Sequence, residues 1–170
     1  MLNFLFRGLT ARPAAGERLF EAITAEARGH HWYVAGEVPD SLDGRFAMVA
    51  TITALSIVRL ERLGDPGNLL SVALTERFIE VMESEHRELG LGDPTLGKTV
   101  RRLVGSLARR IELWRTALAD DAGWTDSVRK SVYRDEPSEA ALQHSSAALE
   151  ALWGKLKSAG VNQLAEGKIE

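Results

Sequence analysis

The sequence predicts an all-α protein, a single-domain bundle of about six helices around a buried central helix. Three observations lead to this prediction. Apolar residues recur at spacings of three and four in several segments, which is typical of amphipathic helices. No segment alternates apolar and polar residues for long enough to indicate a strand. Finally, residues 46–58 carry no charge, so this segment is suited to burial on nearly every side.

The central helix is expected within residues 38–63. Its uncharged part spans roughly 20 Å, less than the ~30 Å hydrocarbon layer of a membrane, and its length therefore favours a core helix over a membrane span. Pro39 precedes two candidate N-cap residues, Asp40 and Ser41. Asp43 follows in the first turn, where a negative charge stabilises a helix.

Apolar periodicity, Gly and Pro together predict the remaining helices. The helix that begins at Pro94 has the most regular apolar stripe in the chain, which indicates one face buried against other helices. Residues 30–39 are expected to form an aromatic-rich connection. Asp93 is the expected N-cap before Pro94. The five helices expected besides the central one cover residues 17–28, 68–89, 94–119, 125–133 and 137–160.

Composition limits the function classes. A chain of 170 residues with 45% hydrophobic content suits one globular domain that buries about 70% of its unfolded surface. It contains no cysteine, which excludes a disulfide framework and a cysteine zinc site. The net charge of −3 gives no global attraction to nucleic acid. The N-terminal segment lacks the long apolar region of a secretion signal.

No motif nominates catalytic chemistry. Glu83 and His86 form a Glu-x-x-His unit, but di-iron bundles need a second copy of it, which the sequence lacks. Adjacent His30 and His31 do not have the spacing of helical metal ligands, so surface or packing roles are favoured. Neither a Gly-x-Ser-x-Gly elbow nor a phosphate-binding glycine loop is present. We therefore expect no enzyme activity, no metal and no cofactor.

Two consecutive helices differ in the sign of their charged residues. The helix at 68–89 is rich in glutamate, whereas the next one is rich in arginine. In one reading the two helices neutralise each other across an antiparallel pair. In the other, the arginine side docks phosphate, anionic lipid or an acidic partner, because guanidinium groups suit all three. The residues expected to carry this docking surface are Arg101, Arg102 and Arg109.

Four segments occur in an order that resembles the ubiquinol–cytochrome c chaperone family, the assembly factors of the cytochrome bc1 complex. They read LFEAITAEAR at 19–28, VPDSLDGRF at 38–46, VRLERL at 58–63 and HRELGLGDPTLGKTVRRL at 86–103. The resemblance covers residues 19–133. It implies a non-enzymatic helical protein that binds newly made cytochrome b, an apolar membrane-protein client.

The resemblance also implies partners and a location. Mitochondrial family members work with a small partner protein near the ribosomal exit, whereas this short chain is more similar to bacterial members. A cytoplasmic location, including the inner-membrane surface, is thus expected over the mitochondrial matrix. Contact with the ribosome or with an anionic membrane would use the basic helix. The chain would comprise an N-terminal extension (1–15), the chaperone-like helical domain (16–160) and a C-terminal tail (161–170).

The sequence departs from the family pattern at a few positions. The family has an acid and then a His after the Arg-Phe of the first motif, where this chain has Ala47 and Thr51. Further on, Ala108, Arg109 and Arg110 replace an aromatic-Gly-Arg ending. These differences leave the expected fold unchanged. They bear instead on which client the protein binds.

Two readings apply to the motif at 39–46. In the structural reading, Asp40, Ser41 and Asp43 begin the central helix, Gly44 permits close backbone approach, and Arg45 pairs with Asp40 or Asp43. In the functional reading, a client-binding groove presents charged and aromatic side chains from this motif and from the preceding connection. Those side chains are Trp32, Tyr33, Asp40, Asp43, Arg45 and Phe46.

Three function classes follow. The first is an assembly chaperone or adaptor that binds cytochrome b through a helical groove and a basic face. The second is a general helical interaction module with a different client. The third is a carrier of an apolar ligand or a small-molecule enzyme, which requires a closed pocket with convergent polar groups.

Overall fold

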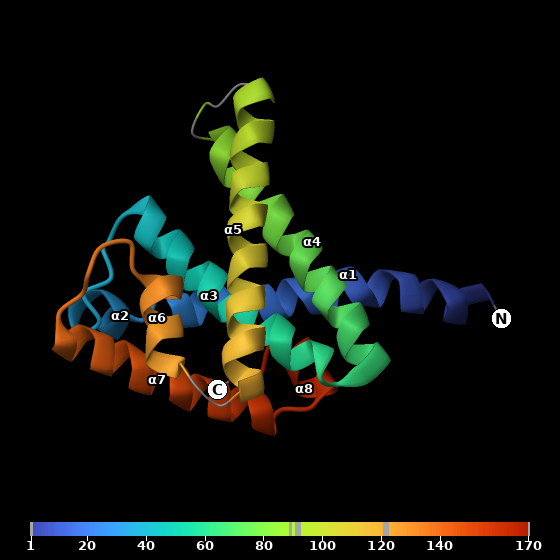
Figure 1. The fold of residues 1–170 in the computed structure, drawn as a ribbon. Coiled ribbons are helices and arrows are strands. Elements are labelled where there is room, and N and C mark those ends of the chain that lie inside the picture. Colours follow the sequence, from blue (N-terminus) through green and yellow to red (C-terminus); the bar gives the residue numbers. More distant parts are fainter. Residues whose placement is uncertain (1, 89, 91–92, 121–122, 170) are drawn as a thin grey trace.

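Eight helices, and no strand, make up the part of the chain that the computed structural model describes (Figure 1). The backbone is described for residues 2–88, 90, 93–120 and 123–169, and the side chains within these ranges from residue 14 onward, apart from 93, 94 and 120. The predicted all-α fold is confirmed. The helices are α1 (Leu2–Ala27), α2 (His30–Val34), α3 (Leu42–Glu61), α4 (Gly64–Glu88), α5 (Asp93–Asp120), α6 (Trp124–Val132), α7 (Glu139–Ser158) and α8 (Val161–Ala165).

The predicted central helix is α3, and it lies among the other helices as expected (Figure 1). Almost every residue from Ala47 to Leu60 is buried, including its three hydroxyl side chains. Ser56 donates to the carbonyl of Ile52 in its own helix, at 2.9 Å. The hydroxyl of Thr51 instead reaches Ser131 on α6. The uncharged segment is thus the core around which α1, α4, α5, α6 and α7 pack.

Helix α4 carries the predicted apolar ladder, and α5 carries the predicted stripe. Phe78 of α4 meets Phe20 of α1 edge to face, with ring centroids 6.3 Å apart. On α5 the stripe faces α3, the helix with which it makes most contact. The buried members of the ladder are Leu70, Leu74, Phe78 and Met82, and those of the stripe are Leu96, Val100, Leu103, Leu107 and Trp114.

Three boundaries differ from the prediction. Helix α4 begins at Gly64 and not near Asn68. Proline is tolerated in the first turn of a helix, because the N–H that it lacks would have no partner there. Pro66 therefore lies in the first turn of this helix and does not precede it. Residues 30–34 form the short helix α2 and not an open connection. Helix α1 begins at Leu2, so residues expected as an extension are helical. The side chain of Asp93, which was predicted as an N-cap, lies outside the described residues.

The C-terminal residues pack onto the bundle. Leu164 of α8 and Ile169 beyond it are both buried. Arg18 of α1 donates from Nε to the carbonyl of Ala165, at 3.1 Å. Residues 161–169 are therefore part of the folded domain, where the sequence suggested a tail.

Candidate functional site

The motif at 39–46 forms the start of α3. Ser41 is the N-cap residue, and its hydroxyl accepts a hydrogen bond from the backbone N–H of Gly44, at 3.2 Å. Gly44 lies so close to the preceding loop that a Cβ atom there would stand 2.0 Å from the carbonyl oxygen of Pro39. The close backbone approach expected at Gly44 is thus confirmed. Of the two residues proposed as the N-cap, Asp40 and Ser41, the structure has Ser41 in that role.

The charged side chains of the motif pair with each other and with a neighbouring loop. Arg45 donates from Nε to Oδ1 of Asp40, at 2.7 Å, and this hydrogen bond lowers the pKa of the Asp40 carboxyl. Asp43 lies 3.5 Å from Nη1 of Arg134. All four side chains are exposed. This geometry supports the structural reading, and it also leaves these groups accessible at the surface.

The aromatic residues proposed for a client groove are not on an open surface. The placement of Trp32 there is wrong, because its ring is fully buried and its indole N–H donates to the carbonyl of Glu26, at 3.0 Å. Tyr33 is half-buried, and its hydroxyl donates to the carbonyl of Ala27, at 2.7 Å. Phe46 is half-buried against Phe78, with centroids 6.0 Å apart. These rings anchor α2 and α3 within the bundle.

A buried polar cluster joins α3, α5 and α6 at Ser131. The Ser131 hydroxyl lies 2.8 Å from the hydroxyl of Thr51 and accepts from the indole N–H of Trp114, at 3.1 Å. Its carbonyl accepts from Nε of Arg110, at 2.9 Å. Ser131, Thr51 and Trp114 are completely buried. Sequence reasoning missed this cluster, because nothing distinguishes Ser131 from the other serines of the chain.

Arg110 belongs to the interior and not to the basic face of α5. Besides Ser131 it contacts Ser106, and its guanidinium lies 5.8 Å from the centroid of the Phe46 ring. Burial, together with the charge of Arg109, lowers the pKa of Arg110 to about 10. It remains charged at neutral pH and ties α5 to α6.

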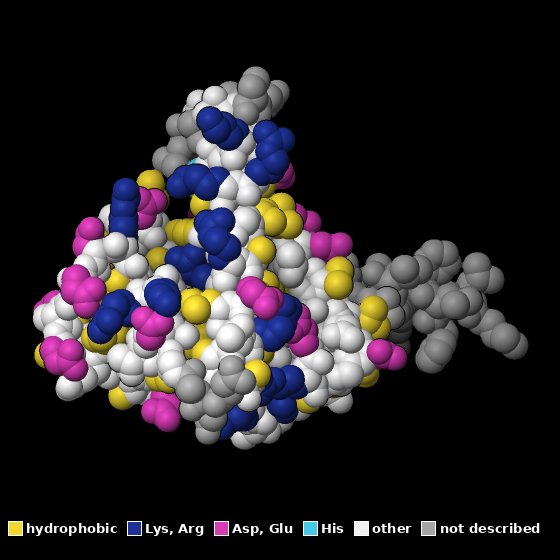
Figure 2. Space-filling model, in the orientation of Figure 1, with side chains coloured by type: hydrophobic (Ala, Val, Ile, Leu, Met, Phe, Trp, Pro, Cys, Tyr) yellow, Lys and Arg dark blue, Asp and Glu magenta, His cyan; other side chains and the backbone are white. Residues whose placement is uncertain are grey.

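Four other cations of α5 form an exposed strip that we call the basic ridge. Figure 2 shows Lys and Arg side chains following α5 along one face of the molecule. Like charges on neighbouring helical turns repel each other, so the ridge does not stabilise the helix. Among the described side chains, none forms an ion pair with a member of the ridge, and the neutralisation by α4 considered above does not occur there. The ridge consists of Lys98, Arg101, Arg102 and Arg109, all exposed.

A cleft of about 500 Å³ opens between α4 and α5, with α3 as its floor. Its apolar part comes from Ile57 on α3, Val72 on α4, and Ala108 and Ile111 on α5. Val72 is 56% exposed although it is apolar, and Leu69, one turn earlier on α4, is 44% exposed. Exposed apolar side chains that adjoin a concave surface are a feature of ligand-binding grooves. The cleft is therefore a candidate binding site.

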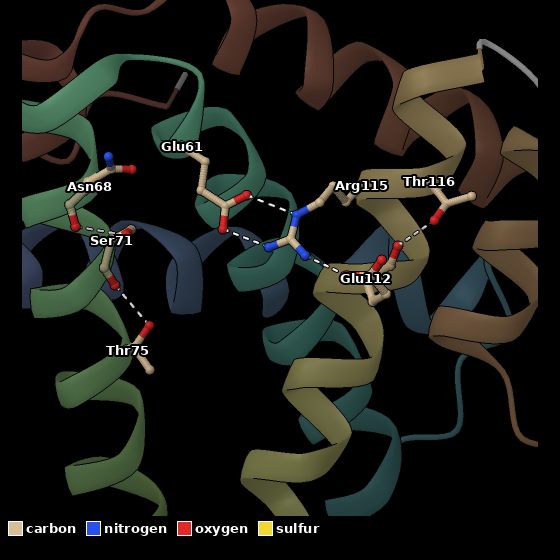
Figure 3. Close-up of polar contacts among 7 residues, drawn as sticks. All are labelled: Glu61, Asn68, Ser71, Thr75, Glu112, Arg115 and Thr116. Atoms are coloured by element: carbon tan, nitrogen blue, oxygen red, sulfur yellow. Dashed lines mark hydrogen bonds and ion pairs between the residues drawn. The ribbon is translucent and has the colours of Figure 1, made fainter.

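Three of the residues that line the cleft form an ion-pair network, which Figure 3 shows. Arg115 of α5 donates to both carboxylate oxygens of Glu61 on α3, at 3.2 and 2.8 Å, and it also pairs with Glu112 one turn earlier. The hydrogen bond with Glu61 raises the pKa of Arg115. Because Arg115 lies between two carboxylates, it is held in place at the edge of the cleft. Arg115 was not among the arginines that the sequence assigned to a docking surface.

His31, His86 and His144 make packing contacts in the structure, whereas His30 is exposed. Nδ1 of His31 lies 3.0 Å from Nε2 of His144, so α2 and α7 share a hydrogen bond. Burial lowers the pKa of His31. Nδ1 of His86 lies 2.8 Å from the carbonyl oxygen of Met82 in the preceding turn. In the described part of the chain, no three side chains of His, Asp or Glu gather as metal ligands would.

Comparisons with known proteins identify relatives of this arrangement. The sequence model of a family described as ubiquinol-cytochrome C chaperone matches residues 35–169. The crystal structure of the Cbp3 homolog from Brucella abortus is similar to this chain, with a TM-score of 0.81 and 25% identity, over 100% of this chain and 96% of that one. No curated protein matches the sequence. None of the described helices is long and apolar enough to cross a membrane.

Proposed function

Because this chain belongs to the ubiquinol-cytochrome C chaperone family, whose members serve cytochrome bc1 assembly, we propose that it binds newly made cytochrome b. Binding is reversible and leaves the client chemically unchanged, without nucleotide, metal or cofactor. The description of the family names a chaperone, which supports a role without catalysis. The protein thus shields apolar client surface until assembly proceeds.

The cleft between α3, α4 and α5 carries this proposal. A chaperone for a membrane protein needs accessible apolar surface in a concave site, where an apolar helix can place side chains at i, i+3, i+4 and i+7. Val72 supplies such surface on one wall, and Ala108 and Ile111 supply it on the other. Exposed Leu69 extends it along α4. No catalytic constellation is required for this role.

The basic ridge supports a location next to an anionic surface. Lys98, Arg101, Arg102 and Arg109 present four positive charges to solvent on a chain whose net charge is −3. Phosphate groups of membrane lipids and of ribosomal RNA both attract such a strip. We place the protein at the cytoplasmic face of the inner membrane, where cytochrome b is inserted. The exposed side chains of Asp40, Asp43 and Arg45, with half-buried Tyr33 and Phe46, remain a proposed contact for the client or for a small partner protein.

Affinity capture under mild detergent tests the client. Cytochrome b is expected to co-purify with the tagged protein, and Val72→Lys is expected to reduce its recovery by about tenfold, because a cation would stand on the apolar wall. Val34→Lys is the matched control, since Val34 of α2 is similarly exposed, at 60%, but lies outside the cleft. Failure to recover any respiratory subunit, with normal bc1 assembly after gene deletion, contradicts the proposal. Recovery of another membrane protein favours a general interaction module.

Charge reversal of the basic ridge tests the anionic surface. The triple variant Arg101→Glu, Arg102→Glu, Arg109→Glu is expected to lose binding to vesicles of anionic lipid by more than tenfold, at about fivefold per charge near a membrane. Raised salt should weaken wild-type binding in the same way. The measurement is cosedimentation with anionic and neutral vesicles, and with ribosomes. Binding that is indifferent to both the reversal and salt removes this role from the ridge.

A further inference from the structure

The walls of the cleft carry charge in an uneven pattern. Three carboxylates line it, those of Glu61, Glu76 and Glu112, against the single cation Arg115. The cleft therefore has an excess of two negative charges beside its apolar floor. This sign is opposite to that of the basic ridge, which lies on the same helix, α5.

Arg115 does not neutralise this excess. Its guanidinium is already engaged by Glu61 on one side and by Glu112 on the other (Figure 3). Glu76, on the opposite wall, forms no ion pair with any described side chain and is exposed. A carboxylate at the edge of an apolar cleft is a ready partner for a cation that arrives with a ligand.

The dimensions of the cleft fit one face of a helix. The lining residues extend over Ser71–Glu76 on α4 and Ala108–Arg115 on α5, which is about two turns of each, or roughly 10 Å. A volume of about 500 Å³ holds a few aliphatic side chains but not a whole helix, whose diameter is about 10 Å. The occupant therefore lays two or three apolar side chains into the cleft and keeps its other face outside.

We propose that the cleft binds an apolar helix that ends in Lys or Arg, with the apolar side chains on Ile57, Val72 and Ile111 and the cation at Glu76. Transmembrane helices carry such cations at their cytoplasmic ends. The proposal rests on the function proposed above, since it specifies which part of a membrane-protein client is recognised. An acidic segment is rejected by the same carboxylates, so the cleft distinguishes the cytoplasmic flank of a client helix by charge.

Synthetic helical peptides test the charge preference. Three labelled peptides share one apolar Leu/Ala face and end in two Lys, two Gln or two Glu residues. Titrated into the full chain, the Lys peptide is expected to bind about tenfold more tightly than the Glu peptide, with the Gln peptide between them. This difference should shrink at high salt. Equal affinities for the three peptides, or no binding by any of them, overturn the proposal.

Two protein variants test the location. Glu76→Gln is expected to weaken the Lys peptide by two- to fivefold and to leave the Gln peptide unchanged, whereas Glu85→Gln, an exposed change on the same helix outside the cleft, leaves both unchanged. Val72→Lys should weaken the Lys and Gln peptides, because it places a cation on the apolar wall, and Val34→Lys should weaken neither. Lys-peptide binding that survives Val72→Lys overturns the assigned site. Capture of cytochrome b is measured separately, so failure of the peptides is distinguishable from failure of the proposed function.

Discussion

Replacing Gly44 with alanine is expected to lower the free energy of unfolding by about 3 kcal/mol. The new Cβ atom would stand 2.0 Å from the carbonyl oxygen of Pro39 and 3.0 Å from its carbonyl carbon. Both atoms belong to the backbone, so no side chain can turn away, and the loop before α3 must shift. Forced overpacking of this kind typically costs about 1–3 kcal/mol, and a contact this short belongs at the upper end. Urea unfolding followed by circular dichroism measures the change.

Gly154→Ala is the matched control. Gly154 lies in the helix α7, and a Cβ atom there would meet nothing within 4 Å. The same substitution is therefore expected to stabilise the protein by about 0.5–1 kcal/mol, since alanine loses less backbone entropy in a helix. Opposite signs for the two glycines are the expected result. A Gly44→Ala variant as stable as the wild type would show that the loop at Pro39 yields freely and that the motif does not fix the start of α3.

The sequence predicted those features that depend only on residues close together along the chain. The uncharged run of α3, the ladder of α4 and the stripe of α5 are periodic patterns, and each predicted its buried face. The start of α3 was also predictable, because an N-cap serine and a close-packed glycine act over only a few residues. The Asp40–Arg45 pair belongs to the same class. Local spacing is enough to place such groups.

Features that depend on the packing of distant helices were not predictable. Trp32 was expected near a surface groove, but only the fold shows that α2 inserts its ring into the core. Arg110 and Arg109 are adjacent in sequence, yet one is tied to Ser131 and the other is exposed. One feature of the sequence did indicate the cleft but was overlooked. Val72 is apolar, yet it does not belong to the apolar ladder of α4. An apolar residue outside the buried stripe of an amphipathic helix indicates accessible apolar surface.

The two faces of α5 differ in charge, and this difference agrees with the membrane docking proposed above. The ridge is positive and attracts an anionic surface, whereas the adjoining cleft has excess negative charge and an apolar floor. In the proposed function, the protein docks through the ridge and receives, in the cleft, a client segment that is apolar and basic at the same membrane. The two surfaces carry opposite charges, so lipid phosphates that bind the ridge do not compete for the cleft, and the client's cations do not compete for the ridge.

Replacing Ser131 with alanine is expected to destabilise the protein by about 2 kcal/mol. The substitution removes the hydroxyl that accepts a hydrogen bond from the indole N–H of Trp114 and that pairs with the hydroxyl of Thr51. A buried donor left without a partner costs about 1–3 kcal/mol. Thr51 retains a bond to the carbonyl of residue 131, at 3.1 Å, so the larger loss falls on Trp114. Thermal or urea unfolding, together with the Trp fluorescence of the native state, measures the change.

Ser56→Ala makes this prediction specific. Ser56 is buried as completely as Ser131, but its hydroxyl donates only to a carbonyl of its own helix, at 2.9 Å. Removal of this local hydrogen bond leaves no donor on another helix without a partner. The cost of Ser56→Ala should therefore stay below about 1 kcal/mol. If the two substitutions cost the same, the cluster at Ser131 does not hold α3, α5 and α6 together. If Ser131→Ala alone is costly, the polar cluster sets the position of α5, and with it the geometry of both the ridge and the cleft.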